Sequence, residues 1–101
     1  MTEIELEIDI TKKSYLDDTI KEFWTKKNNP GYEFFKEKIS ALLLSLSKGD
    51  YIEFLTYING SYGRDILVDF QTSYFKILDK HGIVDEQGNS KIMVKIQPVI
   101  K

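Results

Sequence analysis

Carboxylates on a predicted β-hairpin are the first groups in this sequence that could do chemistry. Glu53, Asp65 and Asp69 would share the outward face of that hairpin, and carboxylates gathered in this way can hold a divalent metal for phosphodiester cleavage. Their spacing is loose, and no nearby lysine completes the set that a nuclease would need. Among 16 acidic residues such a grouping is expected by chance, so we assign these residues no metal and no catalytic role.

His81 is the only histidine, and the chain contains no cysteine. Metal sites built on paired histidines or on thiolates are therefore excluded. A nucleophilic serine would need His81 beside it as a base, but no glycine pattern typical of a nucleophile elbow surrounds any serine. We interpret His81 as a favourable cation or hydrogen-bond donor at the C-terminal end of a short helix. The sequence indicates no enzyme and no cofactor.

Basic and aromatic residues could contact phosphates or bases. The loop 59–64, Asn-Gly-Ser-Tyr-Gly-Arg, lacks the following helix and the lysine of a phosphate-binding loop. The net charge is −2, from 14 basic and 16 acidic residues, so no overall basic field attracts nucleic acid. A nucleic-acid-associated role stays open as the alternative function. Its candidate residues are Lys12, Lys13, Lys26, Lys27, Tyr62 and Arg64.

The first ten residues carry an acidic stripe. Apolar and acidic side chains alternate from residue 3 to residue 10, which is the period-two pattern of a half-buried strand. The acidic positions are Glu3, Glu5, Glu7 and Asp9, and the apolar ones are Ile4, Leu6, Ile8 and Ile10. The stripe could bind a basic partner, but we favour neutralisation by Lys91 and Lys95, which requires the first and last strands to be neighbours. If they are not, the stripe becomes a serious binding candidate.

The strand predicted over residues 51–58 supplies the preferred interface. Its outward positions are Tyr51, Glu53, Leu55 and Tyr57, an apolar set for a face that meets solvent. Exposed tyrosine and leucine in one patch are typical of protein interfaces. If a helix covers this side, the same residues belong to the core instead. The pattern alone leaves both interpretations open.

The elements that must position these groups follow from periodicity and from chain breaks. We expect a strand over 4–10, a helix from about 12 to 27 with Thr11 or Ser14 as its N-cap, and a second helix beginning just beyond Pro30. Gly49 would cap the second helix in a left-handed conformation. The two helices should pack as an antiparallel pair with Trp24 as its core anchor.

The second half of the chain contains most of the expected strands. Residues 51–58 and 65–71 predict a β-hairpin with a five-residue loop. Residues 73–84 permit a helix or a strand, and Gly82 favours a short helix. A strand over 92–96, limited by Pro98, closes the chain. The predicted order is β-α-α-β-β-(α)-β.

Length and composition agree with one ordinary globular domain. The chain has 101 residues, of which 42% are hydrophobic and 30% charged. We therefore expect a single α+β domain over residues 1–101, with about four mainly antiparallel strands and a helix pair packed on one face. The absence of cysteine, of a signal-like N-terminus and of a long apolar run indicates a soluble cytoplasmic chain without a membrane segment.

The leading functional hypothesis is a non-enzymatic protein-interaction module, because no set of polar residues in the sequence is typical of a catalytic or ligand-binding site. A small inhibitor, immunity or accessory protein fits this description. The partner would be another protein or a second copy of the chain, with nucleic acid as the alternative. The expected partner-binding residues are Tyr51, Glu53, Leu55 and Tyr57, together with Glu3, Glu5 and Glu7.

Overall fold

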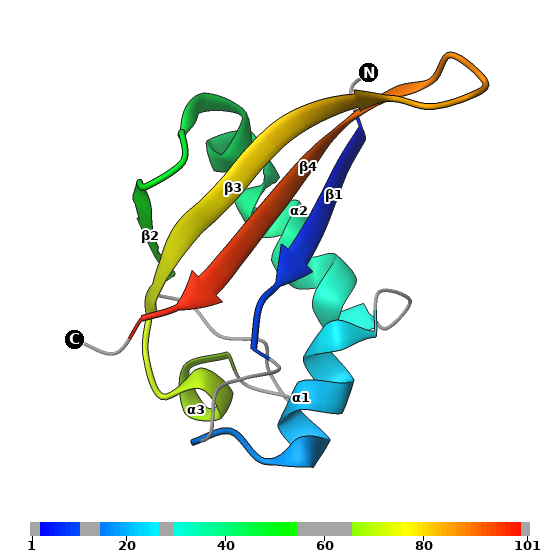
Figure 1. The fold of residues 1–101 in the computed structure, drawn as a ribbon. Helices are drawn as coiled ribbons and strands as arrows, with labels where there is room; N and C mark the ends of the chain where they lie inside the picture. The colour runs from blue at the N-terminus through cyan, green and yellow to red at the C-terminus, as the bar shows by residue number, and fades with distance from the viewer. Residues whose placement is uncertain (1–2, 11–14, 27–29, 55–65, 100–101) are drawn as a thin grey trace.

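A computed structural model of the chain describes residues 3–10, 15–26, 30–54 and 66–99 (Figure 1). The described strands are β1 (Glu3–Ile8), β2 (Tyr51–Glu53), β3 (Tyr74–Val84) and β4 (Ser90–Pro98). The described helices are α1 (Asp18–Thr25), α2 (Pro30–Ser45) and α3 (Ile66–Phe70). The predicted α+β class, with about four strands and with helices packed against the sheet, is confirmed.

The four strands form one mixed sheet in the order β1-β4-β3-β2. β4 pairs antiparallel with β3, and β3 pairs antiparallel with β2, so the sheet is mainly antiparallel as predicted. β1 pairs parallel with β4, with Leu6 opposite Val94 and Ile8 opposite Ile96. The first and last strands are therefore neighbours, which is the condition for neutralising the acidic stripe.

The helices leave one face of the sheet open in the described part of the chain. Figure 1 shows α2 crossing behind the strands, with α1 and α3 beyond the end of the sheet at which β1 and β4 finish. α2 buries Tyr32, Phe35, Ile39 and Leu43, which recur at the spacing of one helical face. Leu42 lies beside this buried face and is 47% exposed.

A cluster of four aromatic side chains in mutual contact joins the helices to the sheet. Trp24 of α1 lies 6.0 Å from Phe35 of α2 and 5.2 Å from Phe70 of α3, measured between ring centroids. Phe75 of β3 completes the cluster, with its ring centroid 5.4 Å from that of Phe35 and 5.3 Å from that of Phe70. All four side chains are fully buried. The prediction that Trp24 anchors the core is confirmed, and its contacts extend to all three described helices.

α1 is shorter than the helix predicted over 12–27. Asp17 is its N-cap, and the Asp17 carboxylate accepts a hydrogen bond from the Ile20 N–H at 2.9 Å, so neither Thr11 nor Ser14 caps this helix. Thr11 and Ser14 lie outside the described residues. With 8 residues against the 16 of α2, α1 is about 12 Å long, roughly half the length of α2. The two helices therefore meet over a short stretch around Trp24 instead of packing along their full lengths.

The hairpin predicted from 51–58 and 65–71 is wrong. Residues 66–70 form α3, and β2 pairs with β3, with Ile52 opposite Phe75. Residues 55–65, which contain the predicted loop, lie outside the described residues. α3 buries Phe70 and leaves Val68 69% exposed, because a helix places these two side chains in different directions. An alternating strand would have placed them on the same face.

The helix favoured over 73–84 is also wrong, since residues 74–84 form the strand β3. Gly82 lies within that strand and does not cap a helix. The third helix and the third strand have thus exchanged places, and the observed order is β-α-α-β-α-β-β. Gly49 is left-handed, with φ of +94°, but it lies in the turn that leads to β2, and its N–H donates to the Ile77 carbonyl at 2.8 Å.

Candidate protein-interaction surface

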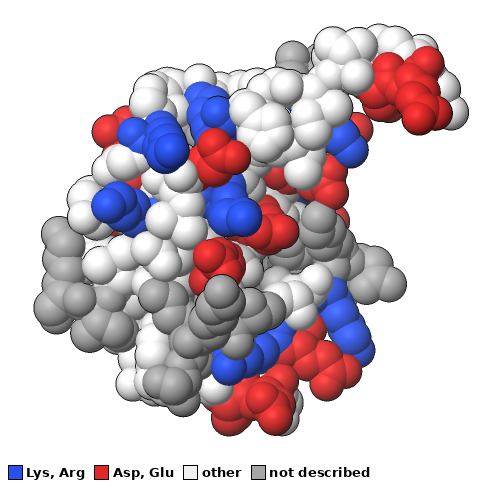
Figure 2. All heavy atoms as spheres, in the orientation of Figure 1, with Lys and Arg blue, Asp and Glu red and all other residues white. Residues whose placement is uncertain are grey.

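The open face of the sheet begins with the acidic stripe of β1, in which Glu5 and Glu7 pair with lysines of β4. The Lys91 ammonium lies 2.9 Å from the Glu5 carboxylate, and the Lys95 ammonium lies 3.3 Å from that of Glu7. The hydrogen bond and the charge of Glu5 raise the pKa of Lys91. Figure 2 shows acidic and basic side chains intermingled on this side of the molecule. The predicted pairing of the two terminal strands' charges is confirmed.

These ion pairs are surface features. The Glu5 and Lys91 side chains are about 30% exposed, at 28% and 32%, and Glu7 is 54% exposed. Exposed pairs contribute little to stability because water already solvates both charges. Their main effect is to halve the net negative charge of the stripe, because two lysines face its four carboxylates. Glu3 stays exposed at the start of β1.

Tyr51 and Glu53 lie on the same open face, at its β2 end. Tyr51 is 50% exposed, and the Lys76 ammonium from β3 lies 5.8 Å from the centroid of its ring. Glu53 is opposite Tyr74, and its hydrogen bond with the Tyr74 hydroxyl raises the pKa of Tyr74. These two candidates face solvent and do not belong to the core. Leu55 and Tyr57 lie outside the described residues.

His81 lies on the same face, in β3. It was expected at the C-terminal end of a helix, so this expectation is wrong. Its Nδ1 lies 3.0 Å from the Asp79 carboxylate, and both side chains border a depression that Met93 and Lys95 also line. A histidine oriented by a carboxylate can act as a base, but no serine or threonine is among the described residues that line this depression. The pair therefore has no nucleophile to activate there.

The carboxylates considered for a metal site are not gathered together. Asp69 is buried and accepts a hydrogen bond from the Trp24 indole N–H at 2.8 Å, whereas Glu53 is on the exposed sheet face. Asp65 lies outside the described residues. Within the described ranges, no group of three or more His, Asp or Glu side chains is placed to hold a metal ion.

Sequence reasoning missed two polar contacts that position the elements. Asp69 satisfies the buried indole of Trp24, and the Lys80 ammonium donates to the carbonyls of Leu44 and Leu46, at 3.1 and 2.7 Å, at the end of α2. A buried tryptophan usually needs an acceptor, so Trp24 carried a signal for such a partner. Nothing local identified Asp69 as that acceptor.

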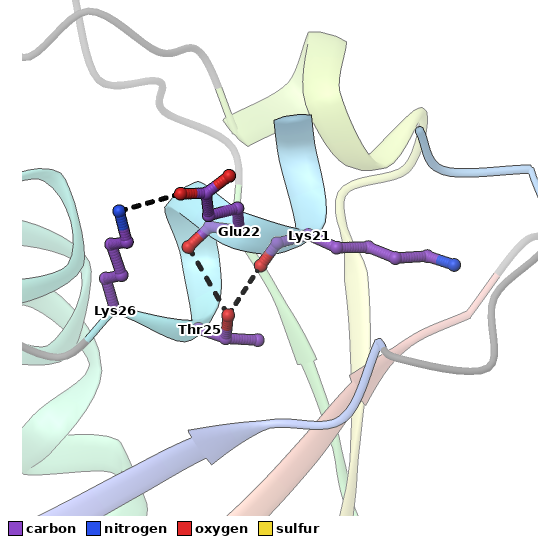
Figure 3. Close-up of polar contacts among 4 residues, drawn as sticks. All are labelled: Lys21, Glu22, Thr25 and Lys26. Atoms are coloured by element: carbon purple, nitrogen blue, oxygen red, sulfur yellow. Dashed lines mark hydrogen bonds and ion pairs between the residues drawn. The ribbon is translucent and has the colours of Figure 1, made fainter. Parts of the chain in front are cut away.

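The basic residues considered for nucleic acid are represented in the described part by Lys26. Its ammonium lies 2.8 Å from the Glu22 carboxylate, one turn earlier in α1 (Figure 3), and this contact lowers the pKa of Glu22. The Thr25 hydroxyl beside it donates to the Lys21 carbonyl at 2.7 Å (Figure 3). The exposed surface of α1 thus carries charges of both signs. Lys12, Lys13, Lys27, Tyr62 and Arg64 lie outside the described residues.

Comparisons with protein-family models, with curated proteins and with solved structures found no match. The function is therefore argued from the chemistry of this surface. Within the described residues, no helix is long and apolar enough to cross a membrane.

Proposed function

We propose that this protein is a non-enzymatic interaction module of the cytoplasm that binds another protein through the open face of its sheet. A single observation carries this proposal: in the described part of the chain, the helices leave this face uncovered, and it presents the half-exposed ring of Tyr51. A small inhibitor, immunity or accessory protein would act in this way, by presenting a surface to its target.

The face supplies a large part of such an interface. The four strands contain 6, 3, 11 and 9 residues, and usual strand spacings give each residue about 16 Å² of sheet, so the face measures roughly 450 Å². That is a little over half of the roughly 800 Å² that each partner contributes to a standard protein interface. Contacts from the side chains at its rim would supply the remainder.

The chemistry of the face favours a partner of mixed charge with an apolar or aromatic centre. Glu5 and Glu7 already have lysine partners, so a purely basic partner would compete with Lys91 and Lys95. Tyr51 offers a large, rigid side chain next to Lys76, and tyrosine is one of the residues that carry most of the energy in interfaces. We therefore assign Tyr51 as the anchor, with Glu53 beside it.

The test is affinity capture from the native host lysate with the wild-type chain and the variant Tyr51→Ala, followed by a binding measurement with the purified partner. We expect one specific partner with wild type and roughly 30-fold weaker binding by Tyr51→Ala. Glu22→Ala, which changes an exposed pair on α1, is the matched control and should bind as wild type does.

Two results would overturn the proposal. Recovery of the same partners with equal affinity by wild type and Tyr51→Ala would exclude the Tyr51 surface. Retention of an oligonucleotide at low salt and its release at moderate salt would favour the nucleic-acid-associated alternative, because phosphate contacts weaken steeply with ionic strength.

A further inference from the structure

The outer part of the β3–β4 hairpin projects beyond the rest of the sheet (Figure 1). β2 pairs with β3 only over residues 74–76, and the turn before β2 bonds to β3 as far as Ile77, whose N–H donates to the Asp50 carbonyl at 2.9 Å. Beyond this point, no strand in the described part of the chain pairs with the outer side of β3. Residues 79–84 are therefore paired on one side only, with β4.

The unpaired side of β3 carries the backbone groups of Gly82 and Val84. The Asp85 N–H donates to the Asn89 carbonyl at 2.9 Å, so Asp85 bonds across the hairpin. Pairs with and without hydrogen bonds alternate along an antiparallel ladder. Val84, one residue earlier, and Gly82, three residues earlier, therefore direct their N–H and carbonyl groups away from β4.

This edge is open to solvent. Gly82 has no side chain and is exposed, so its exposure is that of the main chain, and Val84 is 72% exposed. In the described part of the chain, no hydrogen bond reaches the outward N–H of either residue. A lysine on an edge strand usually hinders pairing, but the Lys80 ammonium is held by the carbonyls of Leu44 and Leu46 at the end of α2. The edge at Gly82 can therefore accept another strand.

A shallow hollow lies beside Gly82, on the side of the sheet that α2 covers. It has a volume of about 460 Å³ and a mainly apolar lining, made by Ser47, Lys48, Lys80, His81, Gly82 and Ile92. A Cβ atom placed on Gly82 would have no other atom within 4 Å, so the space next to this residue is empty. An added strand could place an apolar side chain there.

We propose that the added strand is β3 of a second copy of the chain, paired antiparallel about a two-fold axis at Ile83. Gly82 of each copy then exchanges both backbone hydrogen bonds with Val84 of the other, so the contact occurs twice. Val84 follows Lys80 by four residues, so both side chains point to the side of α2. Since directly opposed residues point to the same face, Val84 of one copy enters the hollow beside Gly82 of the other.

Charge favours a second copy as the occupant. The tip of the hairpin is acidic (Figure 2), and the register about Ile83 brings Glu86 of one copy opposite Lys80 of the other. Lys48 lines the same hollow as Lys80. In the described part of the chain, neither Glu86 nor Lys48 forms an ion pair. Each copy thus supplies a carboxylate at the tip and an ammonium at the hollow that complement those of the other copy.

Neighbouring registers are less favourable. A two-fold axis at Gly82 would place Asp79 of one copy opposite Asp85 of the other, and like charges directly opposite one another destabilise strand pairing. A shift further toward β2 would overlap Asp50, which already bonds to β3 at Ile77. The register about Ile83 avoids both conflicts.

The test is sedimentation equilibrium of the full chain over a range of concentrations. We expect a dimer that dissociates on dilution, and slower hydrogen exchange at the Gly82 and Val84 amides when the protein is concentrated. Val84→Pro removes an N–H that has no partner in the described part of the single chain and should weaken the dimer roughly tenfold or more. Val84→Ile retains the N–H and should dimerise as wild type does. A chain that is monomeric at every concentration, or equal dimerisation by the proline variant, would overturn the proposal.

A charge exchange tests the register. Glu86→Lys and Lys48→Glu should each weaken the dimer roughly fivefold at low salt, and the double variant should regain most of the loss. Gln87→Ala, an exposed neighbour on the turn, is the control and should dimerise as wild type does. A double variant without any recovery would exclude this register. Tyr51→Ala should leave dimerisation unchanged, so this inference and the proposed function can fail separately.

Discussion

The two faces of the sheet are built on opposite principles. The covered face is apolar and packs against the helices through a cluster of four aromatic side chains. These are Trp24, Phe35, Phe70 and Phe75, all fully buried. The open face holds charges in pairs, with Glu5 beside Lys91 and with every member of each pair in contact with solvent. The first arrangement removes apolar area from water, which is the main source of folding stability. The second contributes little stability and is free to serve recognition.

This contrast predicts that substitutions on the two faces differ greatly in their effect on stability. Phe35 touches three aromatic rings, those of Trp24, Phe54 and Phe75. Phe35→Ala should lower the free energy of unfolding by about 3–5 kcal/mol, since it removes buried area and leaves a cavity. Urea denaturation followed by far-UV circular dichroism measures this loss. Phe35→Leu is the control and should lose clearly less, and an equal loss for both variants would contradict the cavity argument.

A smaller loss of stability is expected where the covered face contains a polar contact. Asp69→Leu removes the acceptor of the buried Trp24 indole N–H and should cost about 1–3 kcal/mol, the usual penalty for an unsatisfied buried donor. Asp69→Asn retains a carbonyl oxygen as acceptor and should be less destabilising. The free energies of unfolding in urea give the comparison. If Leu at this position is as stable as Asn, the hydrogen bond is not what Asp69 provides.

Sequence patterns located most elements on both faces but failed between residues 66 and 84. Ile66, Val68 and Phe70 alternate as a strand would, yet α3 forms there and buries Phe70 against Trp24. In β3, a register shift between Ile77 and Asp79 interrupts the period-two alternation after the buried pair Phe75 and Ile77. A bulge of this kind conceals a strand from a periodicity test.

The candidate surface was predictable only where its residues belong to regular strands. Once β1 and β4 are neighbours, the alternation of each strand places Glu5 and Glu7 within reach of Lys91 and Lys95. The contact between Trp24 and Asp69 joins residues 45 positions apart, and no local pattern encodes it.

Tyr32 lies where the two faces meet, at the edge of β1, and it makes stability depend on pH. Burial, reinforced by the negative charges of Glu33, Glu5 and Glu7, raises the pKa of Tyr32 from 10.0 to about 12. A raised pKa means that the folded state keeps the proton longer than the unfolded state. The stabilisation is therefore complete below about pH 10 and is lost as pH rises from 10 to 12.

The variant Tyr32→Phe isolates this effect. At neutral pH it should be less stable than wild type by about 1 kcal/mol, because the Leu6 carbonyl loses its donor. As pH rises from 10 to 12, the difference should shrink and then reverse, since phenylalanine has no proton to lose. Urea titrations at several pH values measure the difference, and the other tyrosines cancel in it. A difference that does not change with pH would show that Tyr32 is not buried as described.

The smallest effect on stability is expected on the open face, at the ion pair of Glu5 and Lys91. Because Glu5 raises the pKa of Lys91, the pair contributes to stability below about pH 10.5, the ordinary pKa of lysine, and this contribution is lost as pH rises through the higher folded value. Glu5→Gln should change stability less than Tyr32→Phe does, and the change should diminish at high salt. It should also return the pKa of Lys91 towards 10.5, which an NMR titration of the lysine side chains detects.

Glu3→Gln is the matched control for this prediction. Glu3 acts on Lys91 only through its charge, so this substitution should lower the pKa of Lys91 less. If the two substitutions lower it equally, the described contact between Glu5 and Lys91 is not what shifts it, and the open face is held by its overall charge and not by specific pairs.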